Sequence, residues 1–170
     1  FGWPLCRRAI ILSDEGYLLQ QALDLLNGRV LYSEMDAFIT PGIWFTLAGA
    51  FALFGPSVLV SRAVIVIAYM ALAVTGYRIV APVAGRAWGL GTVVGLLLFS
   101  VWAFPAWTFA FYSPVAILLA LAAVERLLAW HREARARDLV WVGILVGLSV
   151  CFKQNYGVLA ALGIGFTYLA

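Results

Sequence analysis

Apolar and polar positions alternate along this chain in long blocks rather than at the short spacings of a water-soluble fold. After residue 62, apolar runs follow one another, separated by short connections rich in arginine, glycine or proline. A membrane-spanning helix needs about 20 mostly apolar residues. We therefore expect four spans and the start of a fifth: Ala63–Val80, Trp88–Trp107, Pro114–Trp130, Leu139–Phe152 and Val158–Ala170.

The segment before residue 62 predicts two helices that do not cross. Leucine and alanine recur at helical spacing between Asp14 and Asn27, with Ser13 or Asp14 as the cap, which is typical of an amphipathic helix lying in a membrane interface. Gly28 is a suitable stop, because glycine accepts the left-handed conformation after a helix end. The run Pro41–Phe54 is too short to span and predicts a second interfacial or partly inserted helix.

The arginines predict the orientation of the chain. One cluster, Arg78 and Arg86 with the turn at Pro82 and Gly85, precedes two consecutive predicted spans, and the segment His131–Asp138 follows them. Connections rich in lysine and arginine face the cytoplasm. This rule places residues 13–62, the turn at Phe109–Pro114 and the predicted break Lys153–Gly157 on the outer side.

Composition agrees with an all-α, polytopic transmembrane bundle. Of 170 residues, 65% are hydrophobic and 11% are charged, and the mean hydropathy is +1.00. Soluble domains are about 45–50% apolar and about 25% charged. The net charge of +3 sits in clusters at span ends and does not indicate nucleic-acid binding. Since the last apolar run continues to Ala170, we expect residues 1–170 to be the N-terminal part of a larger module, with 13–62 as an outer loop and 63–170 as transmembrane helices.

Candidate chemistry begins with two adjacent carboxylates, Asp14 and Glu15, in a chain that has no acidic residue from Ala37 to Val124. Lys153 follows an apolar run directly, and an ionisable residue at such a depth suggests a function. A carboxylate that takes a proton from a hydroxyl and cations that hold a phosphate are two parts of a group-transfer site. Arg29, Arg62 and Lys153 are the cations on the predicted outer side.

Each of these features has a second interpretation. The acidic pair can simply cap a helix and favour its dipole, and Lys153 can simply extend to the lipid headgroups. Three aromatic residues on the outer side, Tyr32, Trp44 and Tyr112, are typical of interfacial anchors.

The order of these residues resembles the first outer loop of GT-C glycosyltransferases, in particular the family of protein O-mannosyltransferases and lipid A aminoarabinose transferases. The matching positions are Asp14–Tyr17, Gly28, Leu31–Tyr32, Thr40–Gly42, Leu53–Gly55 and Arg62. The segment Lys153–Gly157 is similar to a later lysine- and glycine-containing segment of that family.

The resemblance implies a donor sugar on a polyprenyl phosphate and a lipid, glycan or protein acceptor, used at the outer face of a bacterial plasma membrane. Asp14 would be the general base of an inverting transfer, assisted by Glu15. Lys153 and Arg62 would stabilise the departing phosphate. The substrate loop would contain Tyr32, Glu34 and Asp36, with Glu34 where relatives more often have aspartate.

The resemblance also implies an enzyme without a cofactor. Many relatives carry a second acid in the next outer loop, but Phe109–Pro114 contains none, so we expect no metal. Two other function classes stay open. A transporter or flippase subunit would have polar groups inside its spans and paired half-repeats. In a non-catalytic membrane scaffold, the acidic pair would only cap a helix.

Overall fold

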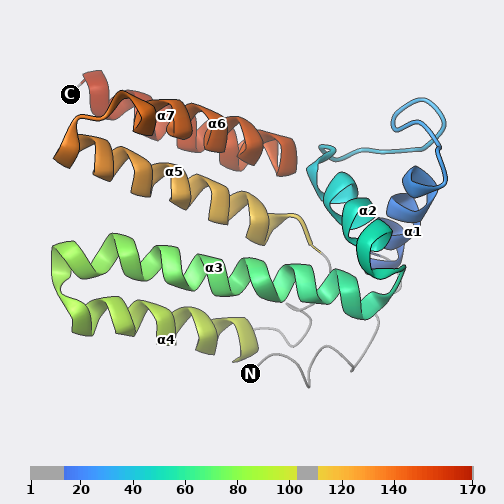
Figure 1. Ribbon diagram of the computed structural model, residues 1–170, viewed down its shortest axis with the longest axis horizontal. Coiled ribbons are helices and arrows are strands. Elements are labelled where there is room, and N and C mark those ends of the chain that lie inside the picture. The colour runs from blue at the N-terminus through green and yellow to red at the C-terminus, as the bar shows by residue number, and fades with distance from the viewer. Residues whose placement is uncertain (1–13, 103–110, 170) are drawn as a thin grey trace.

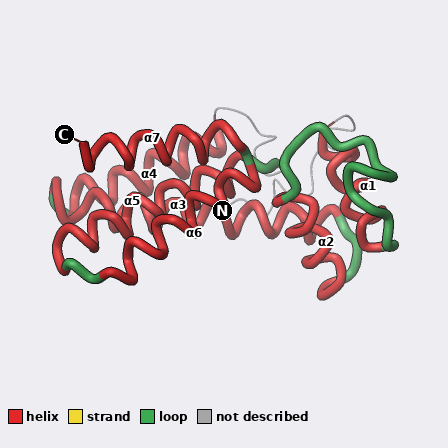
Figure 2. Tube along the Cα trace, turned by 90° about the horizontal axis from the view of Figure 1, so that it is seen from above, coloured by secondary structure: helices red, strands yellow, loops and turns green. Residues whose placement is uncertain are grey.

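The computed structural model describes residues 14–102 and 111–169, and within these ranges the regular structure is entirely helical. The all-α prediction is confirmed for this part of the chain. Helices α3 to α7 extend along the long axis of the molecule, and α1 and α2 lie together at one end of it (Figures 1 and 2). The helices are α1 (Asp14–Leu26), α2 (Gly42–Phe54), α3 (Val58–Ala84), α4 (Arg86–Trp102), α5 (Ser113–Glu133), α6 (Ala136–Phe152) and α7 (Gln154–Leu169).

Two helices in the described part, α3 with 27 residues and α5 with 21, are long and apolar enough to cross a membrane. The other three expected spans fall on α4, α6 and α7, which have 17, 17 and 16 residues. At 1.5 Å per residue, the part of each helix that the structure describes reaches about 25 Å, against the roughly 30 Å of a hydrocarbon core. Length and composition therefore support membrane association, and a larger number of spans stays a prediction.

Three connections are shorter than predicted. Pro82 lies inside α3, and the chain reverses at Gly85, whose φ of +94° suits glycine. Only residues 134 and 135 separate α5 from α6, because Ala134 adopts a left-handed conformation that ends α5 abruptly. Lys153 alone separates α6 from α7, since its extended backbone is enough to break the helix. Polar residues in these segments were predicted as loops, but most of them occupy terminal helical turns.

The two helices predicted before residue 62 are confirmed, with α1 ending one residue before Asn27 and Gly28 at φ +90°. Their apolar faces form a core with the start of α3: Leu18, Ala22, Ile43, Trp44, Leu47, Phe51 and Ile65. The interpretation of Trp44 as an interfacial anchor was wrong, because its side chain is fully buried in this core. The apolar face of α1 is covered by protein, which the amphipathic pattern alone does not reveal.

Several predicted features lie outside the described residues. They are Ser13 as a helix cap, the last five residues of the expected span Trp88–Trp107, Phe109 at the start of the outer turn, and the continuation at Ala170.

The start of α2 lies directly against the end of α6. A Cβ atom added at Gly42 would come within 2.7 Å of the Cys151 carbonyl oxygen and 2.8 Å of the Phe152 ring. Only a residue without a side chain permits this approach. The contact places α1 and α2 at the same end of the molecule as the break between α6 and α7 (Figure 1).

We predict that Gly42→Ala lowers the free energy of unfolding by about 1–3 kcal/mol, because the methyl group separates α2 from α6. Gly49→Ala in the same helix is the matched control, since its Cβ would meet nothing within 4 Å, and we expect it to be neutral or stabilising by up to about 1 kcal/mol. Thermal unfolding in detergent measures both. Equal stability of the two variants would contradict the close contact.

Candidate functional site at the α1 and α2 end

A buried ion pair joins the first turn of α1 to the N-terminal part of α3. Arg62 donates from Nε to Glu15 Oε1 at 2.8 Å and from a terminal nitrogen to Oε2 at 2.7 Å. Glu15 is fully buried and Arg62 is 3% exposed. This two-point geometry is the strongest that a guanidinium and a carboxylate form. Glu15 and Arg62, predicted as an assisting acid and a phosphate ligand, are therefore partners of each other in this structure.

Asp14 differs from its neighbour. It is the first residue of α1, and it is exposed. Among the described residues, its carboxylate forms no hydrogen bond or ion pair. The positive end of the helix dipole stabilises its negative charge. Of the two adjacent acids, Asp14 is thus the one that can accept a proton from a molecule outside the protein.

The loop between α1 and α2 is held by its own polar groups. Glu34 accepts a hydrogen bond from the Val30 backbone N–H at 2.8 Å, and the Tyr32 hydroxyl donates to the Ile39 carbonyl at 2.7 Å. Tyr32 has a positive φ of 64°, which is uncommon outside glycine and indicates a conformation imposed by these contacts. The side chains of Tyr32 and Glu34 therefore stabilise the loop in this structure.

Asp36 contributes its backbone to this loop, while its side chain is exposed. Its carbonyl oxygen accepts from the Tyr17 hydroxyl at 2.6 Å and from Gln21 at 3.4 Å. Burial, and to a smaller extent the charge of Asp36, raises the pKa of Tyr17. The raised pKa favours the protonated hydroxyl, which is the form that donates this hydrogen bond. The Tyr17 ring also stacks on Phe38 at 5.3 Å between ring centres.

Lys153 lies between α6 and α7 in a ring of neutral groups. Its Nζ donates to the Ser113 hydroxyl at 3.0 Å, and it lies over the aromatic rings of Tyr156 at 4.9 Å, Tyr112 at 5.2 Å and Phe111 at 5.9 Å. Cation–π contacts of this kind position an ammonium group without neutralising it. Within the described residues no carboxylate lies in ion-pair range of Lys153, so its charge is available to an anion.

The sequence pattern predicts an interfacial anchor at Tyr112 and no role for Ser113, and it does not reveal that both contact Lys153. The available signal was topological. If α5 begins and α6 ends on the same side of the bundle, as the arginines predict, residues 111–113 and 153 share that side and can come into contact.

The predicted site residues lie in two groups near α2, and the two groups are not connected to each other by hydrogen bonds or ion pairs among the described residues. The Glu15–Arg62 pair and Asp14 lie where α1 meets α3, and Lys153 lies next to the α2 start through Phe152. All are at the same end of the molecule (Figure 1), but in the described part of the chain no hydrogen bond or ion pair links Asp14 to Lys153. Within that part, no cluster of three or more His, Cys, Asp or Glu residues is placed to hold a metal.

We predict that Glu15→Gln or Arg62→Met lowers the free energy of unfolding by about 3–5 kcal/mol, because each removes one charge of a buried, doubly hydrogen-bonded ion pair. The double variant Glu15→Leu/Arg62→Met should cost less than either single change. Asp24→Asn is the control, since Asp24 pairs at 3.0 Å with an exposed Arg29, and such pairs contribute about 0–1 kcal/mol. Thermal unfolding of the four variants tests the pair. If Glu15→Gln or Arg62→Met lowered the stability as little as Asp24→Asn does, the result would argue against a buried pair.

Comparison with known proteins assigns no family to this chain. No protein family, curated protein or solved structure matches it. Asp14, Lys153 and the groups that hold them are therefore the features from which a function is inferred.

Proposed function

We propose that this protein is a multi-pass membrane glycosyltransferase that moves a sugar from a polyprenyl phosphate to an acceptor hydroxyl. The observation that carries the proposal is the presence of an exposed carboxylate and an ammonium group, neither paired with an opposite charge in the described residues, at the same end of a helical bundle. The resemblance of residues 14–62 to the outer loop of GT-C enzymes supports it.

The reaction needs these two charges at two different points. Asp14 takes the proton of the acceptor hydroxyl as its oxygen attacks the anomeric carbon. The bond between that carbon and the phosphate oxygen breaks, and the phosphate leaves with the electron pair. Lys153 balances the negative charge that develops on the phosphate. Attack on the side opposite the leaving group inverts the anomeric configuration.

In this proposal Glu15 and Arg62 are positioning residues. Their buried pair fixes the first turn of α1 against α3 and so orients Asp14. Both Nε and a terminal nitrogen of Arg62 are already used on Glu15, and its side chain is buried. A phosphate would have to displace this carboxylate to use the same nitrogens, so we assign the donor phosphate to Lys153 alone.

The proposed orientation in the membrane follows from charge. We infer that α3 and α5 cross the bilayer and that α4, α6 and α7 complete the bundle. Six arginines, at positions 78, 86, 126, 132, 135 and 137, lie toward the end opposite α1 and α2. The positive-inside rule makes that end cytoplasmic. Asp14 and Lys153 then face outward, which in a bacterial plasma membrane is where a lipid, glycan or protein acceptor is available.

We predict that Asp14→Asn lowers the rate of sugar transfer by about 10²–10⁴-fold, because the amide cannot accept the proton of the acceptor. The assay follows a radiolabelled sugar from its polyprenyl phosphate to acceptor, with the protein reconstituted in liposomes. Asp24→Asn is the matched control: the same change in the last turns of the same helix should leave the rate unchanged. Full activity of Asp14→Asn would remove the proposed base.

A second prediction concerns Lys153→Gln. We expect a lower kcat together with weaker donor binding, because the variant loses the charge that faces the phosphate. Lys153→Arg should retain part of both. Donor analogues without the phosphate should bind both proteins equally. A loss of kcat that is the same for Lys153→Arg and Lys153→Gln would indicate a structural role instead.

A further inference from the structure

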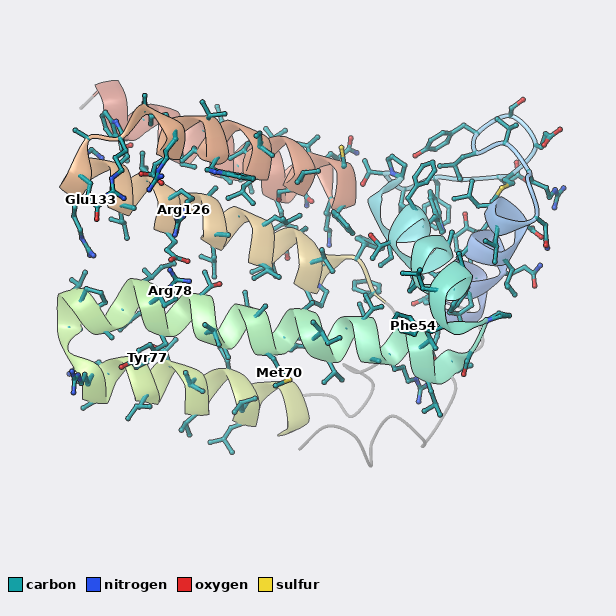
Figure 3. The ribbon with its side chains drawn as sticks, in the orientation of Figure 1. Phe54, Met70, Tyr77, Arg78, Arg126 and Glu133 are labelled. Carbon is teal, nitrogen blue, oxygen red and sulfur yellow. The ribbon has the colours of Figure 1, made fainter. Side chains whose placement is uncertain are left out.

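A cavity of about 410 Å³ lies at the end of the molecule opposite Asp14, between α3, α5 and α6. Figure 3 shows Arg78 on α3 and Arg126 on α5 directed toward each other across this space, with Glu133 at the end of α5. The cavity is lined by arginines, carboxylates and five uncharged residues: Tyr77, Arg78, Ala81, Pro82, Glu125, Arg126, Leu128, Ala129, Arg132, Glu133, Arg135, Arg137 and Asp138.

Charge in this cavity is not balanced. Five arginines face three carboxylates, so the lining carries a formal excess of two positive charges. Glu125 bridges Arg78 at 2.8 Å and Arg126 at 3.2 Å, and Asp138 lies 3.5 Å from Arg126. These contacts fix Arg78 and Arg126 in place and link three helices.

The excess charge belongs to two arginines in particular. Arg135 pairs with Glu133 at 2.6 Å, but Arg132 and Arg137 form no ion pair with any described residue. Both contribute to the lining and both are exposed. Guanidinium groups recognise phosphate through two parallel hydrogen bonds. A cavity with two such groups in excess therefore has the chemistry of a phosphate site.

We propose that this cavity binds the phosphate headgroup of an anionic membrane lipid. The volume is within the range of roughly 300–1,000 Å³ that small-molecule sites have. The cavity adjoins the ends of the two helices long enough to span a bilayer, so a headgroup in it would leave its acyl chains beside apolar helix surface. Val83, next to the lining residue Pro82, is 77% exposed and offers such a surface. Anionic lipids attract arginine clusters at the cytoplasmic face of membranes.

This site is separate from the proposed sugar transfer, since it lies at the other end of the bundle (Figure 3). Neither Asp14 nor Lys153 lines it. Its test is therefore a binding measurement, whose outcome does not depend on whether the protein transfers a sugar.

The test uses the purified protein in a neutral detergent and isothermal titration with three probes: dihexanoyl phosphatidylglycerol, dihexanoyl phosphatidylcholine and inorganic phosphate. We expect the anionic lipid to bind, with about tenfold weaker affinity in Arg132→Gln and in Arg137→Gln, because each loses a charged hydrogen-bond donor. Arg86→Gln is the matched control: Arg86 is exposed at the same end of the bundle and does not line the cavity. It should bind like the unmodified protein.

A variant that binds more tightly shows that changes in affinity do not come from misfolding, because a misfolded protein would lose affinity. Glu133→Gln removes a carboxylate from the lining and should tighten binding of the anionic lipid roughly threefold. Binding of inorganic phosphate as tight as that of the lipid would overturn the lipid assignment in favour of a free phosphate. An equal loss in Arg86→Gln, equal binding of phosphatidylcholine, or no binding of phosphatidylglycerol would each overturn the proposal.

Discussion

The buried pair of Glu15 and Arg62 is the constraint on which the outer end of the molecule depends. Removing two charges from water is costly, and their attraction offsets this cost only when both partners are present in good geometry. Here both oxygens of the carboxylate are used by one guanidinium. The position of α1 relative to α3 is consequently restricted to the arrangement that keeps these two contacts.

This restriction matters because α1 is short. A helix of 13 residues is marginal in water when isolated, so α1 depends on what it packs against. Leu18 and Ala22 bury one face against α2, and Glu15 anchors the first turn to α3. Asp14 is adjacent to that anchor but exposed. The structure therefore fixes the Glu15 carboxylate in the interior and leaves the Asp14 carboxylate accessible at the surface. Two adjacent acids thereby have different chemical environments.

Local sequence signals predicted the helical segments and the stop at Gly28 well, because each depends on residues near one another in the chain. The partner of Glu15 lies 47 positions away, and no local pattern identifies which of several outer cations it takes. The burial of Trp44 and the ring of neutral groups around Lys153 likewise depend on packing between helices. The predicted lengths of the connections between helices were too long for a related reason. Polar residues such as Gln154 and Arg137 resemble loop residues, yet they occupy the first turns of helices.

The two ends of the bundle differ in how their charged side chains are arranged, and this difference follows from how closely the helices approach. At the α1 and α2 end, the contact at Gly42 brings α2 against α6, and among the described residues neither Asp14 nor Lys153 pairs with an opposite charge. At the other end, α3, α5 and α6 separate around a cavity, and carboxylates on α5 and α6 hold arginines from α3 and α5 at its edge. In the proposed function the charges of Asp14 and Lys153 act on different parts of one substrate. A surplus of one charge in a shared cavity is suited to hold an anion.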